Sequence, residues 1–252
     1  MPIPPKIHYC WFGGNPLPEL AKKCIDSWKK YFPEYEIIEW NETNYDVNII
    51  PYSAEAYHAK KYAFVSDYAR FWILYNYGGV YFDTDVEVIK RMDDIITKGA
   101  FMGCENDLED ERSAESGVGV NPGLGIAAEP GHAFYKEVLD YYSKLSFYNE
   151  DGSYNKTTVV QHVTRLLEHH GLTNSSAPTL CAGIAIYPKE YFCPMNYETG
   201  QLHITNNTCS IHHYMASWIT KGQKIYIILQ RIIGKKTAGL LVNFLKKHGF
   251  VK

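Results

Sequence analysis

The chain has 252 residues, of which 46% are hydrophobic, 15% aromatic and 21% charged, and its formal net charge is −3. These values fit one large globular domain, with or without a small appendage, and the sequence has no low-complexity segment or internal repeat. No uninterrupted apolar stretch reaches the roughly 18 residues that a membrane-spanning helix needs. The N-terminal residues lack the apolar run of a signal peptide, so we expect a cytoplasmic protein.

Charge is distributed unevenly along the chain. Of the 25 Lys and Arg residues, eight lie between Lys221 and Lys252, where there is no Asp or Glu, so residues 1–220 carry 17 basic against 28 acidic residues. This asymmetry predicts two units, a main domain over residues 1–220 and a basic C-terminal segment over residues 221–252.

The first forty residues have the pattern of a strand, a helix and a second strand. Residues 6–11 are mostly apolar and end at a Gly-Gly-Asn-Pro turn, and residues 36–40 alternate between polar and apolar. Between them, Leu20, Cys24 and Trp28 recur at helical spacing over residues 19–31. This order predicts an α/β fold with a nucleotide site near the strand ends.

The middle of the chain predicts a long helix followed by a buried strand. Residues 53–77 are apolar on most faces and end at Gly78-Gly79, and residues 80–82 lead directly into Asp83-Thr84-Asp85. A strand over residues 86–88 follows, then a polar loop from residue 105 to 119. We expect further helices near residues 132–144 and 157–169, and strands near residues 185–187 and 210–213.

Asp83 and Asp85 are the first candidates for chemistry. Two carboxylates at the end of a buried strand suit Mg²⁺ or Mn²⁺, which in turn bind diphosphate oxygens. Such a cation acts as a Lewis acid for a departing nucleoside diphosphate. Aspartates are also common in polar turns after strands, so the triplet alone does not decide between the two interpretations.

Asp67 and Arg70 strengthen the catalytic interpretation. They are the only charged residues between Tyr62 and Phe82, and their spacing places them on one face of the predicted helix. Buried charges are costly unless they are paired or bound to a ligand. They form either an internal ion pair or a pair that also binds sugar hydroxyls or phosphate.

Several motifs resemble glycosyltransferase family 32, which includes capsular-polysaccharide glycosyltransferases and yeast-type mannosyltransferases. Residues 66–70 (SDYAR) and 75–85 (YNYGGVYFDTD) carry the resemblance, and they are also similar to the sugar-binding core of the large clostridial glucosylating toxins. Residues 7–14 (IHYCWFGG) resemble the first strand of the family, and residues 212–218 (HHYMASW) its closing motif. The resemblance spans about residues 3–220 and implies a GT-A fold, a divalent metal, usually Mn²⁺, and retention at the anomeric carbon.

The resemblance also implies roles for individual residues. Asp85 would ligate the metal directly, and Asp83 would contact the ribose or the sugar, often through the water shell of the metal. Asp67 and Arg70 would hold the transferred sugar. Since no carboxylate stands out as a covalent nucleophile, we expect a front-face mechanism with an oxocarbenium-like transition state.

Nucleotide contacts are implied in the same way. Trp11 would stack on the base, unless it is simply a core residue, and Tyr81 would add to the nucleotide site. Ser217 and Trp218 would bind the diphosphate.

Two histidines and one asparagine complete the candidate site. His212 or His213 would supply a late metal ligand or a diphosphate contact. Because neighbouring residues of a strand point to opposite faces, one of the two histidines is expected to reach the site, and His213 is slightly favoured. Asn121 stands where the family often has a sugar contact, although Pro122-Gly123 also makes an ordinary turn. The usual Thr-Gly-Pro stretch of the family is not found, which leaves the acceptor contacts undefined.

The basic segment predicts two short amphipathic helices. Apolar residues recur at helical spacing in residues 225–232 and again in residues 240–245, with lysines around them. Such helices suit an anionic membrane surface, or they pack on the main domain. We predict peripheral binding to the inner face of the cell membrane. Nucleic acid is not expected as a partner, because the main domain is acidic.

The sequence therefore predicts a retaining, metal-dependent glycosyltransferase that moves a hexose to a glycan or lipid-linked oligosaccharide in bacterial capsular or surface polysaccharide synthesis. The predicted cofactor is Mn²⁺ or Mg²⁺. A UDP-sugar is favoured as the donor, and GDP-mannose is possible. Two alternatives are a phosphohydrolase of the haloacid-dehalogenase type and a non-catalytic module that binds sugar nucleotides and membranes.

Overall fold

The N-terminal strand, helix and strand form as predicted. In this computed structural model, which describes residues 2–106, 117–197, 199–215, 221–234 and 237–239, they are β1 (Lys6–Cys10), α1 (Glu19–Tyr31) and β2 (Glu36–Trp40). β1 and β2 pair in parallel, with Ile7 opposite Ile37. The helix turns its fully buried Cys24 and Trp28 to the core. The strand–helix–strand order thus sets the start of a parallel sheet.

A mixed sheet forms the centre of the described structure, in the order β2-β1-β3-β7-β5-β9-β8, with β6 beside β5. β1 also pairs in parallel with β3, and β5 with β9, while the other pairs of the sheet are antiparallel. The remaining strands of this sheet are β3 (Gly79–Tyr81), β5 (Phe101–Cys104), β6 (Val120–Asn121), β7 (Ile126–Ala128), β8 (Thr179–Cys181) and β9 (Ile184–Tyr187).

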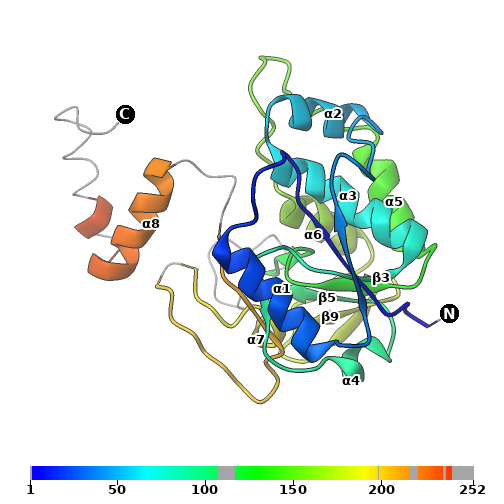
Figure 1. The fold of residues 1–252 in the computed structure, drawn as a ribbon, viewed down its shortest axis with the longest axis vertical. Coiled ribbons are helices and arrows are strands. Elements are labelled where there is room, and N and C mark those ends of the chain that lie inside the picture. Colours follow the sequence, from blue (N-terminus) through cyan, green and yellow to red (C-terminus); the bar gives the residue numbers. More distant parts are fainter. Residues whose placement is uncertain (1, 107–116, 198, 216–220, 235–236, 240–252) are drawn as a thin grey trace.

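Helices cover both faces of this sheet (Figure 1). Because side chains alternate across a strand, Tyr81 joins the apolar cluster on one face and Val80 the cluster on the other. The first cluster lies under α2 (Pro51–His58), α3 (Tyr62–Tyr77), α5 (Ala133–Tyr142) and α6 (Val159–His169), and the second under α1, α4 (Asp93–Ile96) and α7 (Lys189–Phe192). The predicted α/β class, with a mixed sheet flanked by helices, is confirmed.

One predicted helix is two helices. The segment predicted as a single helix over residues 53–77 breaks after α2 and resumes at α3. Lys60 adopts a left-handed conformation with φ of +57°, and the Lys61 N–H donates to the Ala56 carbonyl at 2.9 Å, which closes the C-terminus of α2. Because glycine, and not lysine, usually occupies this conformation, the apolar pattern carried no signal for the break.

A separate two-stranded ribbon extends from the Asp83-Thr84-Asp85 triplet. β4 (Val86–Val88) pairs antiparallel with β10 (Ser210–His212), so that Val86 lies opposite His212. This pairing brings a residue from near the end of the main domain next to the triplet. It is the feature of the fold that assembles the candidate site.

The C-terminal helix α8 (Lys221–Ile233) lies beside the main domain (Figure 1). The second helix predicted for the basic segment, over residues 240–245, lies outside the described residues, as does most of the predicted loop between residues 105 and 119. Among the described residues, no helix combines the length and apolarity needed to cross a bilayer. The division of the chain at residue 220 remains a prediction.

Buried neutral histidines are expected to make the fold sensitive to acid. Burial, together with nearby Arg165, lowers the pKa of His162 to about 4, and its Nδ1 pairs with the Tyr141 hydroxyl at 2.9 Å. Since its pKa in the unfolded chain is about 6.5, the unfolded state binds more protons between these values, and stability falls as the pH drops from about 6.5 to 4. The substitution His162→Phe should therefore lessen the loss of unfolding free energy by up to about 1.4 kcal/mol for each pH unit of acidification.

The check is the free energy of unfolding in urea, measured for both proteins at several pH values across this window. His8 is present in both proteins, and burial lowers its pKa to about 4 as well, so part of the acid sensitivity should remain in the variant. His162→Phe should therefore reduce, without abolishing, the fall in the free energy of unfolding across this pH window. An unchanged slope would show that His162 is not held neutral.

Candidate active site

Asp83 and Asp85 lie at an edge of the sheet where parallel strands end. β2, β1 and β3 run in the same direction, so the residues after each strand meet at one edge, as the sequence predicts. The Asp83 N–H donates to the Gly123 carbonyl at 3.1 Å, and the Val86 N–H donates to the Asp83 carbonyl at 3.1 Å. The backbone of the triplet is therefore fixed on both sides.

Arg70 joins two carboxylates beneath this edge. Its Nη2 lies 3.1 Å from Asp67 Oδ1 and 3.2 Å from Asp83 Oδ1, and its side chain is only 4% exposed. Burial raises the pKa of Asp67 to about 7, with Arg70 opposing the rise and Asp83 adding to it. Burial also disfavours the charge on Arg70, but Asp83 and Asp67 outweigh it and keep the arginine pKa above its usual range. The internal ion pair is thus present and extends to Asp83 of the triplet, whereas binding of sugar hydroxyls or phosphate by Asp67 and Arg70 remains a prediction.

Tyr81 lies under Asp83. Its hydroxyl donates to Asp83 Oδ1 at 3.0 Å, and the Arg70 guanidinium lies 5.1 Å from the centre of its ring. The side chain is 1% exposed, so it does not face a site that a nucleotide can enter. The structure therefore places Tyr81 as a support for Asp83, where a nucleotide contact was predicted.

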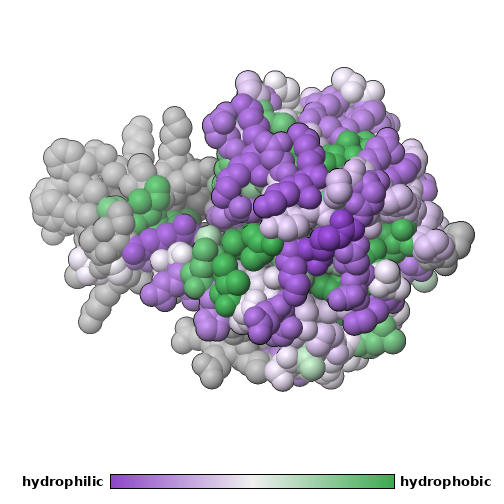
Figure 2. All heavy atoms as spheres, turned by 60° about the horizontal axis from the view of Figure 1, so that its bottom comes forward, coloured by the Kyte–Doolittle hydropathy of each residue, from purple (hydrophilic) through white to green (hydrophobic). Residues whose placement is uncertain are grey.

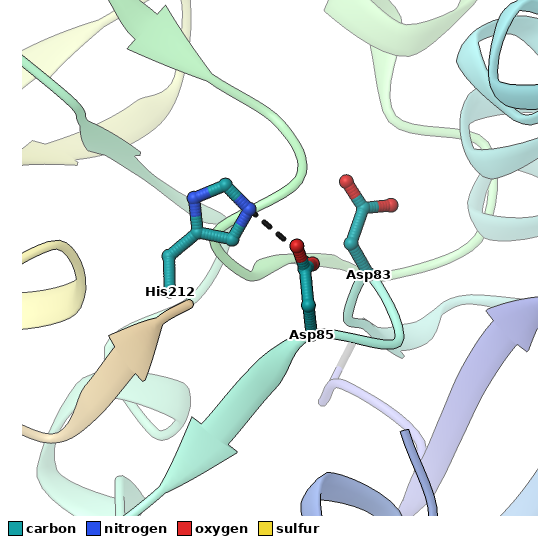
Figure 3. Close-up of side chains that lie close together, drawn as sticks. All are labelled: Asp83, Asp85 and His212. Atoms are coloured by element: carbon teal, nitrogen blue, oxygen red, sulfur yellow. Dashed lines mark ion pairs between the residues drawn. The ribbon is translucent and has the colours of Figure 1, made fainter. Parts of the chain in front are cut away.

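His212 is the histidine that reaches the triplet (Figure 3). Its Nε2 lies 3.3 Å from Asp85 Oδ1, and the Met215 N–H donates to Asp85 Oδ2 at 2.7 Å. Burial opposes the charge on Asp85, but His212 and the Met215 N–H outweigh it, so the pKa of Asp85 falls to about 2. Burial also opposes the charge on His212, but Asp85 raises its pKa well above the ordinary value.

His213 points elsewhere, which reverses the slight preference for it. Its Nε2 lies 2.8 Å from Glu87 Oε2, and Lys23 Nζ lies 3.0 Å from the same oxygen. Its backbone N–H donates to the Asp85 carbonyl at 2.9 Å. The alternation of side chains was predicted correctly, but the pairing with β4 decides which side faces the triplet, and the sequence did not reveal that pairing.

Asn121 is engaged within the protein. Its Nδ2 donates to Glu105 Oε2 at 2.7 Å, and its Oδ1 accepts the Gly123 N–H at 2.7 Å. The side chain thus holds the turn at Gly123 that the backbone of Asp83 contacts. This arrangement supports the turn, which was the alternative to the predicted sugar contact.

Gly123 has a second role, because a side chain there would collide with Asp83. A Cβ atom at Gly123 would lie 2.1 Å from Asp83 Oδ2. Gly123→Ala should therefore displace the carboxylate. A displacement of about 1 Å in a catalytic group can cost a hundredfold in rate, and we expect a loss of about that size.

The measurement for Gly123→Ala is nucleoside diphosphate release, together with the affinity for Mn²⁺ by calorimetry. Gly239→Ala is the matched control, because a Cβ at Gly239 meets no atom of the described residues within 4 Å. Both activity and Mn²⁺ affinity should fall only in the Gly123 variant. Equal activities in the two variants would contradict the role given to this glycine.

The remaining predicted contacts are less defined. Trp11 follows β1 at the same edge of the sheet, is half-buried, and donates its indole N–H to the Asn15 carbonyl at 2.6 Å. Its stacking on a base remains a prediction. Ser217 and Trp218 lie outside the described residues.

The side chains present fit a divalent cation. Asp83, Asp85 and His212 each offer a ligand atom, and these atoms lie within 4.8 Å of one another. Two carboxylates and an imidazole suit Mn²⁺, and the carboxylates also suit Mg²⁺. His212 must lose its proton before the nitrogen that faces Asp85 can bind a cation.

Three supports of the site were not predicted. Glu105 orients Asn121, and Met215 offers its backbone N–H to Asp85. Tyr214 makes this second contact possible, because its φ of +52° turns the chain back towards the triplet. Among the groups that hold the site in place, only the Pro122-Gly123 turn beside Asn121 could be recognised in the sequence. The other supports depend on contacts between distant segments.

Comparison with known proteins agrees with the geometry. Residues 18–102, which include Asp67, Arg70, Asp83 and Asp85, match the family model described as a glycosyltransferase sugar-binding region containing a DXD motif. The resemblance to DXD-containing glycosyltransferases is confirmed over this stretch. Asn121 and His212 lie beyond it.

The similar curated proteins come from two yeasts. The chain is 29% identical over 157 residues to inositol phosphoceramide mannosyltransferase 3 of Schizosaccharomyces pombe, covering 58% of this chain and 38% of that protein. It is 31% identical over 162 residues to inositol phosphoceramide mannosyltransferase 1 of the same yeast, covering 57% and 44%. Mannosyl phosphorylinositol ceramide synthase CSH1 of Saccharomyces cerevisiae is 28% identical over 143 residues, covering 54% and 34%. The aligned region is thus less than half the length of each relative.

Two of the similar solved structures are glycosyltransferases by title. The PaToxG glycosyltransferase superposes with a TM-score of 0.46 at 18% identity, covering 67% of this chain and 70% of the other. The galactosyltransferase LgtC, solved with donor and acceptor sugar analogues, gives a TM-score of 0.42 at 15% identity, covering 74% of each chain. Both similarities are distant.

Proposed function

We propose that this chain, whose residues 18–102 match the DXD-containing sugar-binding region of glycosyltransferases, transfers a hexose from a sugar nucleotide to a glycan or lipid-linked acceptor. The observation that carries the proposal is the meeting of Asp83, Asp85 and His212, with ligand atoms within 4.8 Å, beside the buried ion pairs of Arg70. A divalent cation held there would neutralise charge on the departing nucleoside diphosphate.

The site is open on the side of Asp83. The Asp83 side chain is 29% exposed, whereas those of Asp85, His212 and Asp67 are 10–11% exposed. A donor would therefore approach over Asp83, with Arg70 and Tyr81 holding that carboxylate from below. Asp67 is buried against Arg70 and is poorly placed as a covalent nucleophile. Retention by a front-face route remains part of the proposal.

The donor is proposed to carry mannose. The names of the yeast relatives describe mannosyl transfer, which favours GDP-mannose over the UDP-sugar suggested by Trp11. The same names concern inositol phosphoceramide, so we favour an acceptor on a lipid. A role in bacterial capsular polysaccharide synthesis and a location at the inner face of the membrane stay as predictions.

A donor panel tests the proposal. The protein is incubated with GDP-mannose, UDP-glucose, UDP-galactose and UDP-N-acetylglucosamine, with Mn²⁺, with Mg²⁺ or with a chelator, and nucleoside diphosphate is quantified. We expect release from one donor, dependent on the cation and fastest with GDP-mannose. Orthophosphate release from phosphomonoesters instead would indicate the haloacid-dehalogenase alternative. Binding without turnover, even with acceptors supplied, would indicate the non-catalytic module.

A further inference from the structure

An ordered hairpin before β10 exposes two large apolar side chains. Leu202 is 48% exposed and Ile204 is 55% exposed. The hairpin is held by main-chain hydrogen bonds from the Asn196 N–H to the Gln201 carbonyl at 2.8 Å and from the His203 N–H to the Pro194 carbonyl at 3.0 Å. Its apolar side chains are therefore presented on a defined backbone. Exposed apolar side chains that cluster mark interaction sites more often than isolated ones do.

Helix α8 adds a third apolar side chain next to this hairpin. Arg231 donates from Nη2 and Nε to the Tyr197 carbonyl at 3.2 and 3.4 Å, and its Cδ lies 3.2 Å from the position of a Cβ on Gly200. Ile228, one helical turn before Arg231, is 55% exposed. Figure 2 shows hydrophobic atoms on the described part of α8 and on the neighbouring face of the main domain, with hydrophilic atoms between them.

The charge of this region limits the kind of partner. From Pro194, where the hairpin begins, to Lys252 the sequence has eight Lys or Arg and one acid, Glu198. Both apolar segments thus belong to a predominantly basic stretch of the sequence, although the rest of the chain is acidic. Exposed aliphatic side chains in a predominantly basic part of the sequence match an anionic bilayer, which attracts Lys and Arg.

The same region contacts the candidate active site. The Tyr197 ring packs on the Tyr214 ring, with centroids 5.0 Å apart, and Tyr214 packs on His212 at 4.4 Å. Two ring contacts therefore connect the hairpin to the metal-ligand cluster. A surface bound to this hairpin would lie close to the site.

We propose that residues 194–204 and helix α8 together form a docking surface for anionic lipid bilayers, which holds the active site next to its lipid-linked acceptor. The docking surface differs from a tail that acts alone, because the hairpin of the main domain supplies two of its apolar anchors. Placement of the active site next to a lipid-linked acceptor rests on the proposed function, whereas binding to the bilayer does not.

The test is co-sedimentation of the full chain with vesicles of phosphatidylcholine alone or mixed with phosphatidylglycerol. The full chain should bind only the anionic vesicles and dissociate at high salt. The variant L202S/I204S, which leaves α8 intact, should bind about tenfold more weakly. Leu180→Ser is the matched control, because Leu180 is 78% exposed on β8, outside the docking surface.

Three outcomes would overturn the docking surface. They are no binding of the full chain to anionic vesicles, equal binding by L202S/I204S, and an equal loss in Leu180→Ser. A dimer in solution that dissociates in L202S/I204S would assign the surface to a second copy of the chain instead. Release of nucleoside diphosphate in free solution is measured in parallel for each variant. Vesicle binding without that release would refute only the proposed function.

Discussion

Asp85→Asn is expected to abolish cation-dependent release of nucleoside diphosphate while leaving the fold intact. Asparagine keeps the size of the side chain, and its oxygen can still accept the Met215 N–H that Asp85 Oδ2 accepts at 2.7 Å. The charge that pairs with His212 and would bind the cation is lost. Second-shell partners of metal sites are worth about 10- to 100-fold, so a direct ligand should cost more than about a hundredfold. Turnover with Mn²⁺ and the melting temperature check both parts.

Glu87→Gln provides the matched control for this substitution. Glu87 follows Asp85 by two residues and lies in β4, and its carboxylate contacts His213 and Lys23 outside the metal-ligand cluster. We expect this variant to keep most of its activity. If Asp85→Asn remained as active as Glu87→Gln, the assignment of the metal site to Asp85 would be wrong.

Arg70→Met is expected to reduce both activity and stability. The substitution leaves the buried Asp67 and the partly buried Asp83 without the cation that lies 3.1 and 3.2 Å from them. Removing one partner of a buried ion pair typically costs about 3–5 kcal/mol, because the remaining charge is uncompensated. Unfolding in urea at neutral pH measures this loss. Activity should fall as well, since the Asp83 carboxylate loses a contact that orients it.

The variant Arg91→Met tests whether burial, and not the number of carboxylates contacted, determines how much Arg70 contributes to stability. Arg91 also contacts two carboxylates, those of Glu34 and Asp93, but its side chain is 43% exposed. Exposed pairs of this kind contribute about 1 kcal/mol or less. A stability loss in Arg70→Met no larger than that in Arg91→Met would contradict the bridging role of Arg70.

Local patterns predicted the elements of the fold well. The helix over residues 19–31 and the strand over residues 36–40 were recognised because their apolar periods are clear and turn residues flank them. The short strands β5, β6, β7 and β8 were not predicted. They have two to four residues each, too few to show alternation, and β5, β6 and β7 are buried throughout.

The site residues, too, were predicted correctly where a local sequence pattern marks them. Asp67, Arg70, Asp83 and Asp85 stand close together in the sequence within a recognisable motif, and the structure brings them together. The choice between His212 and His213 depended on the pairing of β10 with β4, in which His212 lies opposite Val86, 126 residues away in the sequence. No local pattern contains this relation. Asn121 was chosen by its position in the family, but only the contact with Glu105 shows that its amide is already engaged.

Asp83, Asp85 and His212 are proposed to hold the cation that serves glycosyl transfer. A crystal of the protein grown with Mn²⁺ and GDP, with diffraction recorded at the manganese absorption edge, tests it most directly. We expect one anomalous peak within bonding distance of the Asp85 carboxylate and an imidazole nitrogen of His212, with the diphosphate of GDP on the side of Asp83. A nucleotide bound with no peak at this cluster, or with manganese held by other residues, would contradict it.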